Sequence, residues 1–261
     1  MWITSWQRSG STWLAEQLAS APRTRLIYEP VNVPDGIVTG EQAALQPVPT
    51  ADMPHVSLVL KALRGQIHGH WVDQLNGSHF PTRTVVKDVR GIELLNEIRE
   101  HERATPIIVL LRHPFAVAAS VVRLGWHEPS LAPETAFERE VERWCVSHTR
   151  ALTTWRAHPA RDSLTTWVTY EELTREFAGA SIDDVVTFLA AHDTAWNTLA
   201  SHRGDLSQRS ATDFAGSTVT IENAWREQAY QHLVATGWSA LYGDDGKQRV
   251  SINEFLATAA L

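Results

Sequence analysis

The sequence predicts an α/β fold in which a central parallel sheet lies between two layers of helices, a three-layer α/β/α arrangement. Strand-like and helix-like patterns alternate along the chain, which is the order that βαβ units produce. The run PIIVLL at residues 106–111 is apolar, as is typical of a strand buried on both faces of a parallel sheet. The chain has 261 residues, 43% of them hydrophobic, and we expect residues 1–261 to form a single domain.

The N-terminal part alternates between regular elements and one long irregular stretch. Residues 1–6 are rich in strand formers and run into a Gly/Ser turn, after which residues 12–18 carry apolar side chains at helical spacing. Residues 25–28 form a second strand candidate, which ends before Pro30 because proline cannot donate a ladder hydrogen bond. Residues 31–56 hold four prolines and two glycines, and this composition predicts an irregular excursion.

The rest of the chain continues the alternation of strands and helices. The same periodicities predict strands at residues 84–87, 106–111 and 165–170 and helices at residues 92–103, 115–124, 137–155 and 181–189. Ser181 resembles an N-cap for the last of these helices. In such a sheet, ligands are expected at the carboxyl ends of the strands.

Charge and cysteine content exclude several classes of protein. The formal net charge of −7 argues against a protein that coats nucleic acid, since backbone binding needs spread positive charge. One cysteine, Cys145, allows neither an intramolecular disulfide nor a thiolate metal cluster. The first residues lack the features of a signal peptide, and no run of about 18 apolar residues predicts a membrane span. We therefore expect a cytoplasmic protein without a membrane span, and the sequence leaves its oligomeric state open.

The segment QRSGSTW, from Gln7 to Trp13, lies between the first strand and the first helix. Backbone amides and the positive end of the helix dipole converge there, Gly10 permits close approach, and Arg8 can grip oxyanions through two parallel hydrogen bonds. The segment therefore predicts a P-loop-like phosphate-binding strand–loop–helix. It lacks the G-x-x-x-x-G-K-[ST] spacing of a nucleotide P-loop, so an ordinary capped turn remains an alternative on chemistry alone.

Several segments within residues 2–228, among them SWQRSGSTWLAEQL and IIVLLRHPFAVAASVV, together resemble sulfotransferases that use 3′-phosphoadenosine 5′-phosphosulfate (PAPS). The stretch SWQRSGSTWLAEQL is similar to the 5′-phosphosulfate loop of that family, and RLIYEP is similar to the form found in carbohydrate sulfotransferases. The stretches TVVKDVRGIELLNEI and IIVLLRHPFAVAASVV resemble its 3′-phosphate region, and WVTYEEL and NAWRE resemble two later segments. The resemblance implies transfer of a sulfuryl group from PAPS to a hydroxyl of a carbohydrate or another small molecule.

The resemblance also implies how PAPS and its product, 3′-phosphoadenosine 5′-phosphate (PAP), would be bound without a metal. Arg112 and Ser120, eight residues apart, would hold the 3′-phosphate. Trp13 and Tyr170 would contact adenine, with a core role as the alternative for Trp13, and Arg209 would close a late loop over the nucleotide. The complete candidate set is Arg8, Ser9, Gly10, Ser11, Thr12, Trp13, Arg112, Ser120, Tyr170 and Arg209.

Three residues are candidates for the chemistry itself. Glu29 ends the second strand beside the phosphate loop and would accept the proton of the acceptor hydroxyl, with a salt-bridge or helix-cap role as the alternative. Lys87 would stabilise the leaving oxygen or the sulfuryl group, unless it pairs with a nearby acid such as Asp88. Arg8 would neutralise charge on the leaving phosphate.

Other assignments remain open at this point. His68, His70 and His113 are weaker candidates for the base, and His113 could also touch the nucleotide. A small-molecule kinase with the same cradle is the first alternative function, although the chain lacks the P-loop lysine and a clear Mg²⁺-holding acid. A non-catalytic nucleotide-binding protein is the second. The acceptor is expected to contact residues 31–80 and 124–136.

Overall fold

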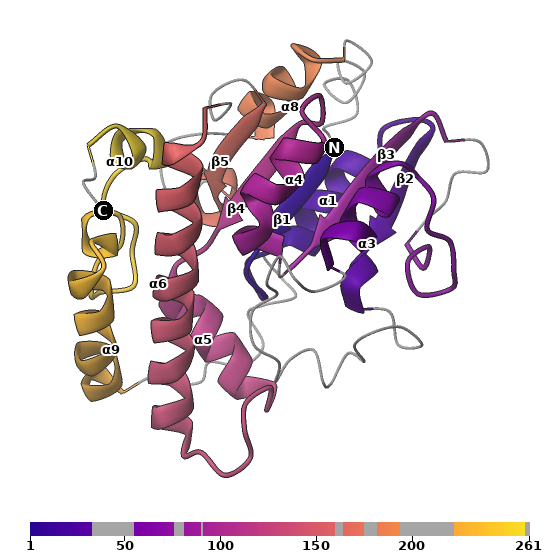
Figure 1. Cartoon of the computed structure of the whole chain (residues 1–261). Helices are drawn as coiled ribbons and strands as arrows, with labels where there is room; N and C mark the ends of the chain where they lie inside the picture. Colours follow the sequence, from indigo (N-terminus) through magenta and orange to yellow (C-terminus); the bar gives the residue numbers. More distant parts are fainter. Residues whose placement is uncertain are drawn as a thin grey trace.

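The computed structural model describes residues 1–32, 55–75, 81–89, 91–159, 164–174, 182–193 and 222–258 (Figure 1). The strands are β1 (Trp2–Ser5), β2 (Thr24–Tyr28), β3 (Arg83–Asp88), β4 (Ile107–Leu111) and β5 (Thr165–Thr169). The helices are α1 (Ser11–Ala19), α3 (His55–Leu63), α4 (Leu95–His101), α5 (Pro114–Arg123), α6 (Pro133–Ala157), α7 (Tyr170–Leu173), α8 (Ile182–Ala190), α9 (Asn223–Ala235) and α10 (Ile252–Thr258). Short 3₁₀ turns cover Pro30–Asn32, Gly91–Leu94 and Trp238–Ala240.

The five strands form one parallel sheet in the order β2-β3-β1-β4-β5. Strand β1 is central and pairs with β3 on one side and with β4 on the other, so that Trp2 lies opposite both Val86 and Ile107. The predicted parallel sheet is therefore confirmed. The order reverses at β1, and the loop after β1 consequently lies at the point where a ligand crevice is expected.

Side chains of each strand alternate between two separate apolar cores. On β4, Ile107 and Val109 belong to a core shared with α3 to α6 and α9, whereas Ile108 and Leu110 belong to a core shared with α1 and α8. Figure 1 shows α6 as the long helix beside the sheet, with α5 and α9 packed against it. Helices thus cover both faces of the sheet, and the three-layer arrangement is confirmed.

The elements differ from the sequence expectation in several places, and helices α9 and α10 are absent from that expectation. The helix expected over residues 92–103 begins with a 3₁₀ turn and becomes α-helical only from Leu95 to His101. Tyr170, expected at a strand end, is the first residue of α7, because the Thr169 side chain caps that helix. Helix α3 was not predicted, although its buried residues His55, Val59 and Ala62 lie at helical spacing. Ser181 and most of residues 31–56 lie outside the described residues.

The described residues hold no candidate for a membrane span or for a metal site. None of the described helices is both long enough and apolar enough to cross a bilayer. The same residues contain no group of three or more His, Cys, Asp or Glu side chains arranged to hold a metal ion.

Candidate active site

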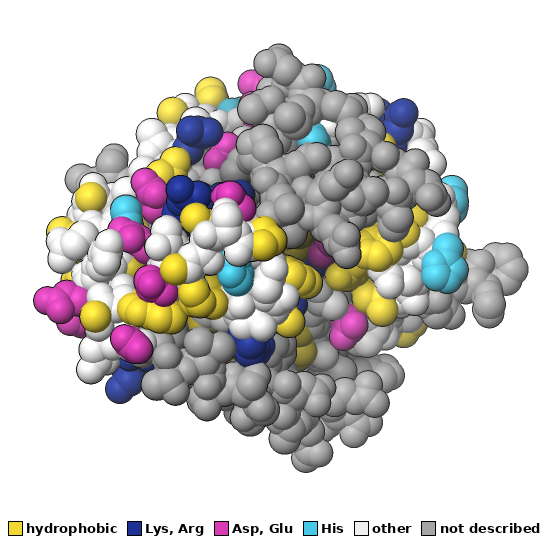
Figure 2. All heavy atoms as spheres, turned by 90° about the horizontal axis from the view of Figure 1, so that it is seen from below, with side chains coloured by type: hydrophobic (Ala, Val, Ile, Leu, Met, Phe, Trp, Pro, Cys, Tyr) yellow, Lys and Arg dark blue, Asp and Glu magenta, His cyan; other side chains and the backbone are white. Residues whose placement is uncertain are grey.

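The carboxyl ends of the five strands bring the predicted site residues to one edge of the sheet. Arg8 follows β1, Glu29 follows β2, Lys87 lies near the end of β3, Arg112 follows β4, and Tyr170 follows β5. Figure 2 views the molecule from below, and on that face hydrophobic side chains lie around a hollow with charged side chains among them. Each strand therefore contributes one side chain to this edge, and together these side chains include basic, acidic and aromatic groups.

The loop between β1 and α1 is strained and polar. Arg8 and Gly10 both have left-handed backbone conformations, with φ of +62° and +88°. Ser9 is fully buried, and its Oγ has no hydrogen-bond partner among the described residues. Helix α1 starts at Ser11 and has no acidic side chain in its first turn. Since buried polar atoms are nearly always paired, a buried hydroxyl without a partner beside the amides of a helix N-terminus fits an oxyanion.

Gly10 packs directly against Tyr170. A Cβ atom on Gly10 would lie 2.4 Å from Cδ2 of Tyr170, closer than real contacts allow, so that only glycine fits both this contact and the left-handed backbone. The Tyr170 ring also packs against Arg112, whose Cζ atom lies 4.5 Å from the ring centroid. Tyr170 thus connects the loop after β1 with the turn after β4.

The guanidinium groups of Arg8 and Arg112 meet at this loop. Arg8 Nε donates a hydrogen bond to Ser120 Oγ at 3.0 Å, and Arg112 Nη1 donates to the Arg8 carbonyl at 3.1 Å. Burial, followed by the positive charges of Arg112 and Arg123, lowers the pKa of Arg8. Positive charge from Arg8, Arg112 and Arg123 is therefore gathered at one edge of a protein whose formal net charge is −7.

Glu29 and Lys87 form an ion pair across the neighbouring strands β2 and β3. The Lys87 side chain is almost completely buried, and that of Glu29 is 13% exposed. Burial lowers the pKa of Lys87, while the Glu29 carboxylate acts in the opposite direction. The sequence offered Asp88 as a possible partner of Lys87. The structure pairs Lys87 with Glu29, which is the salt-bridge role given above as the alternative for Glu29, and it joins the two candidates for chemistry into one unit.

Tyr28 lies at the centre of this unit and was missed by the sequence analysis. Its ring centroid is 4.5 Å from Lys87 Nζ, and its hydroxyl takes part in side-chain hydrogen bonds with Thr12 and Glu29. Burial and the Glu29 charge raise the pKa of Tyr28 to about 12, so its hydroxyl keeps its proton at neutral pH. The sequence signal that could have identified Tyr28 was its position beside Glu29 in RLIYEP. Tyr28 connects the phosphate loop, through Thr12, to the Glu29–Lys87 pair.

Glu140 of α6 is a second residue that the sequence analysis missed. Its Oε1 accepts hydrogen bonds from Trp6 Nε1 at 2.6 Å and from Gln7 Nε2 at 2.9 Å, and it is buried. These bonds fix the residues immediately before Arg8. An acid at position 140 lies between Phe137 and Trp144 in the apolar stripe of the helix, and this was the signal that could have identified it.

The histidine candidates lie in different environments. His113 is buried, its Nδ1 accepts from the Phe115 amide, and its Nε2 therefore donates to the Gly243 carbonyl at 3.1 Å. Burial lowers the pKa of His113 to about 4, which leaves it neutral. This ring caps α5 and ties it to Gly243. His68 and His70 are exposed on the segment after α3.

The last two candidates for nucleotide binding are Trp13 and Arg209. Trp13 is half-buried, packs against the core shared with α1 and α8, and makes an edge contact with Tyr170 at 6.1 Å between ring centroids. In this position Trp13 packs against the core and also has a ring edge near the loop after β1, so both of its proposed roles remain open. Arg209 lies outside the described residues.

Comparison with known proteins identifies the family. The model of the sulfotransferase family matches residues 1–194, and the chain belongs to this family. No curated protein sequence matches at a significant level.

Two solved structures are similar to the chain. The mouse sulfotransferase SULT7A1 complexed with PAP is 16% identical with a TM-score of 0.41, and the match covers 77% of this chain and 62% of the mouse chain, less than two thirds of its length. The sulfotransferase domain from the curacin biosynthetic pathway is 20% identical with a TM-score of 0.41, over 73% of this chain and 72% of that domain.

Proposed function

We propose that this protein transfers the sulfuryl group of PAPS to a hydroxyl of a carbohydrate or another small molecule, as a single-domain cytoplasmic enzyme. The observation that carries the proposal is the convergence of Arg8, Ser120 and Arg112 on one loop at the switch point of the sheet. Membership of the sulfotransferase family supports the same reaction. The RLIYEP segment, similar to that of carbohydrate sulfotransferases, is the reason for placing carbohydrates among the acceptors.

In this proposal, the residues at the site are divided between the two phosphate groups of an adenine nucleotide. PAPS would supply an activated sulfuryl group whose departure leaves negative charge on the 5′-phosphate. The buried Ser9 hydroxyl, the first amides of α1 and the Arg8 guanidinium would hold the 5′ end. Arg112 and Ser120 would bind the 3′-phosphate, and the rings of Trp13 and Tyr170 stand beside the loop for adenine.

Within this proposal, Glu29 removes the proton from the acceptor hydroxyl. Its carboxylate is held by Lys87 and Tyr28, so its position relative to the phosphate loop is fixed before the acceptor arrives. Lys87 and Arg8 provide the positive charge that stabilises the leaving phosphate.

We expect PAP to bind at least tenfold more tightly than AMP, because Arg112 and Ser120 add charged hydrogen bonds to the 3′-phosphate. Isothermal calorimetry with both nucleotides measures this difference directly. The variant Arg112→Ala should bind the two nucleotides about equally. The matched control is Arg139→Ala, which removes an exposed arginine of α6 and should keep the preference. Equal binding by the unmodified protein would contradict the proposed donor.

We expect sulfotransfer to continue in the presence of EDTA, because Arg8 and Lys87 supply the charge that Mg²⁺ supplies in kinases. The measurement is transfer of label from PAPS to a panel of glycosides and phenols, with and without chelator. The same panel with labelled ATP tests the kinase alternative. Activity that disappears with EDTA and returns with Mg²⁺ would favour a kinase over the proposed reaction.

A further inference from the structure

The backbone of Glu29 requires support from its neighbours. Its φ of +41° lies in the left-handed region, which side-chain-bearing residues rarely adopt. On one side, the Glu29 amide donates to the Lys87 carbonyl at 2.8 Å. On the other side, the Glu29 carbonyl accepts from Trp71 Nε1 at 3.3 Å, and the Tyr28 amide donates to the Val72 carbonyl at 2.9 Å. The conformation is therefore held between β3 and the segment that contains Trp71.

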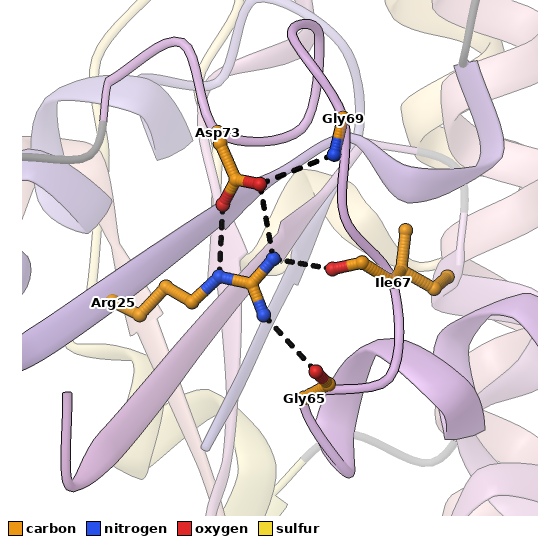
Figure 3. Close-up of polar contacts among 5 residues, drawn as sticks. All are labelled: Arg25, Gly65, Ile67, Gly69 and Asp73. Atoms are coloured by element: carbon orange, nitrogen blue, oxygen red, sulfur yellow. Dashed lines mark hydrogen bonds and ion pairs between the residues drawn. The ribbon is translucent and has the colours of Figure 1, made fainter. Parts of the chain in front are cut away.

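The segment from Gly65 to Asp73 is in turn fixed by Arg25, a buried residue of β2 that Figure 3 shows at the centre of its contacts. Arg25 Nε and Nη2 donate to the two carboxylate oxygens of Asp73 at 2.8 and 3.1 Å. Arg25 Nη1 donates to the Gly65 carbonyl at 3.1 Å, and Nη2 also donates to the Ile67 carbonyl. The Asp73 carboxylate also accepts from the Gly69 amide at 3.2 Å.

This arrangement ties a loop without regular structure to a strand of the sheet. Residues 68–70 are exposed, whereas Val72 is buried in the core and Ile67 and Trp71 pack against it, so Arg25 adds polar bonds to an apolar anchor. The planar guanidinium of Arg25 bonds to both ends of the segment and brings Trp71 and Val72 to the end of β2. Trp71 then packs edge-on against Tyr28, with 5.7 Å between ring centroids.

We propose that Arg25, Asp73 and Trp71 are positioning residues for sulfuryl transfer, acting through the backbone of Glu29. The proposal rests on the proposed function, in which Glu29 removes the acceptor proton. Arg25 and Asp73 fix the segment, and the Trp71 indole N–H holds the Glu29 carbonyl so that the carboxylate faces the phosphate loop. Their effect falls on the chemical step and leaves the binding of the nucleotide unchanged.

The decisive variant is Trp71→Phe, which keeps an aromatic ring beside Tyr28 and removes the indole N–H together with part of the ring, as the control variant below also does. We expect kcat to fall about tenfold, since small misplacements of a reacting group can cost up to about 10²-fold. The KM for PAPS and the calorimetric affinity for PAP should stay within about twofold. The matched control is Trp155→Phe, because the Trp155 indole N–H makes no hydrogen bond within the described part of the chain.

A double-variant cycle with Glu29→Gln separates positioning from a general structural role. If Trp71 acts through Glu29, adding Trp71→Phe to Glu29→Gln should lower kcat no further. Multiplicative losses would overturn the inference and leave the proposed function intact. A fully active Glu29→Gln variant would exclude Glu29 as the base and so overturn the inference, whereas an unmodified protein without sulfuryl transfer would overturn the proposed function. Arg25→Lys should lower kcat in the same way as Trp71→Phe, and if it fails to fold, the Trp71 cycle still decides the question.

Discussion

Replacing Glu29 with glutamine is expected to lower kcat by about 10²–10⁴-fold, the usual contribution of a positioned general base. Glutamine keeps the size of the side chain and much of its hydrogen-bonding capacity, but it accepts no proton at neutral pH. Glu29 lies on the acceptor side of the loop, so the affinity for PAP should change little. Steady-state kinetics with labelled PAPS, together with calorimetry for PAP, test both parts of the expectation.

The ion pair with Lys87 introduces a second effect that must be separated from the loss of the base. In Glu29→Gln, Lys87 stays buried without its carboxylate partner, and removing one member of a buried pair can cost about 3–5 kcal/mol. The double variant Glu29→Gln/Lys87→Met removes both charges and should regain stability without regaining kcat. Glu102→Gln, which breaks the more exposed pair with Arg64, is the control and should remain active. Near-normal kcat in Glu29→Gln would exclude Glu29 as the base, and His68 and His70 would be tested next.

The sheet could be predicted from the sequence because its strands are short apolar runs bounded by turn residues. The run at residues 107–111 is buried at every position, as expected for a strand covered on both faces. Helix α3 was missed because prolines and glycines dominate the residues before it and hide its apolar spacing. Local composition predicted the strands, but it extended the irregular stretch to residue 56, whereas α3 begins at His55.

The position of the candidate site was predictable for a related reason. Parallel strands place their carboxyl ends at one edge, so Arg8, Glu29, Lys87 and Arg112 had to lie near that edge once their strands were recognised. The order of strands within the sheet was not predictable from local patterns. It is this order that makes β2 and β3 neighbours and allows Glu29 to pair with Lys87 in place of Asp88.

Contacts between segments that are far apart in the sequence could not be predicted from the sequence. The hydrogen bonds of Glu140 to Trp6 and Gln7 join residues more than 130 positions apart, and Arg25 reaches Asp73 across 48 positions. Such pairs carry no shared local pattern, and they become visible only when the helices and the sheet are packed together. They surround the residues that the motifs identified, and they fix the orientation of the loop and of Glu29.

Replacing Gly10 with alanine is expected to abolish PAP binding and to lower stability. Alanine pays about 1–2 kcal/mol in the left-handed region, and the new methyl group would have to displace the Tyr170 ring, for which overpacking typically costs about 1–3 kcal/mol more. Movement of Tyr170 disturbs Arg112, which packs on its ring and also bonds to the Arg8 carbonyl. One methyl group therefore disrupts both proposed phosphate positions. Calorimetry with PAP and thermal unfolding measure the two effects.

Gly246→Ala provides the matched control, because Gly246 has φ of +83° and, among the described residues other than its chain neighbours, no atom lies within 4 Å of the position of an added Cβ. It carries the same backbone strain as Gly10→Ala without the collision with Tyr170. We expect Gly246→Ala to lose only about 1–2 kcal/mol of stability and to bind PAP normally. The difference between the two variants then isolates the contact between Gly10 and Tyr170. If both variants bound PAP equally well, the loop after β1 would not be the site of the 5′-phosphate, because a displaced Tyr170 could not leave that position unchanged.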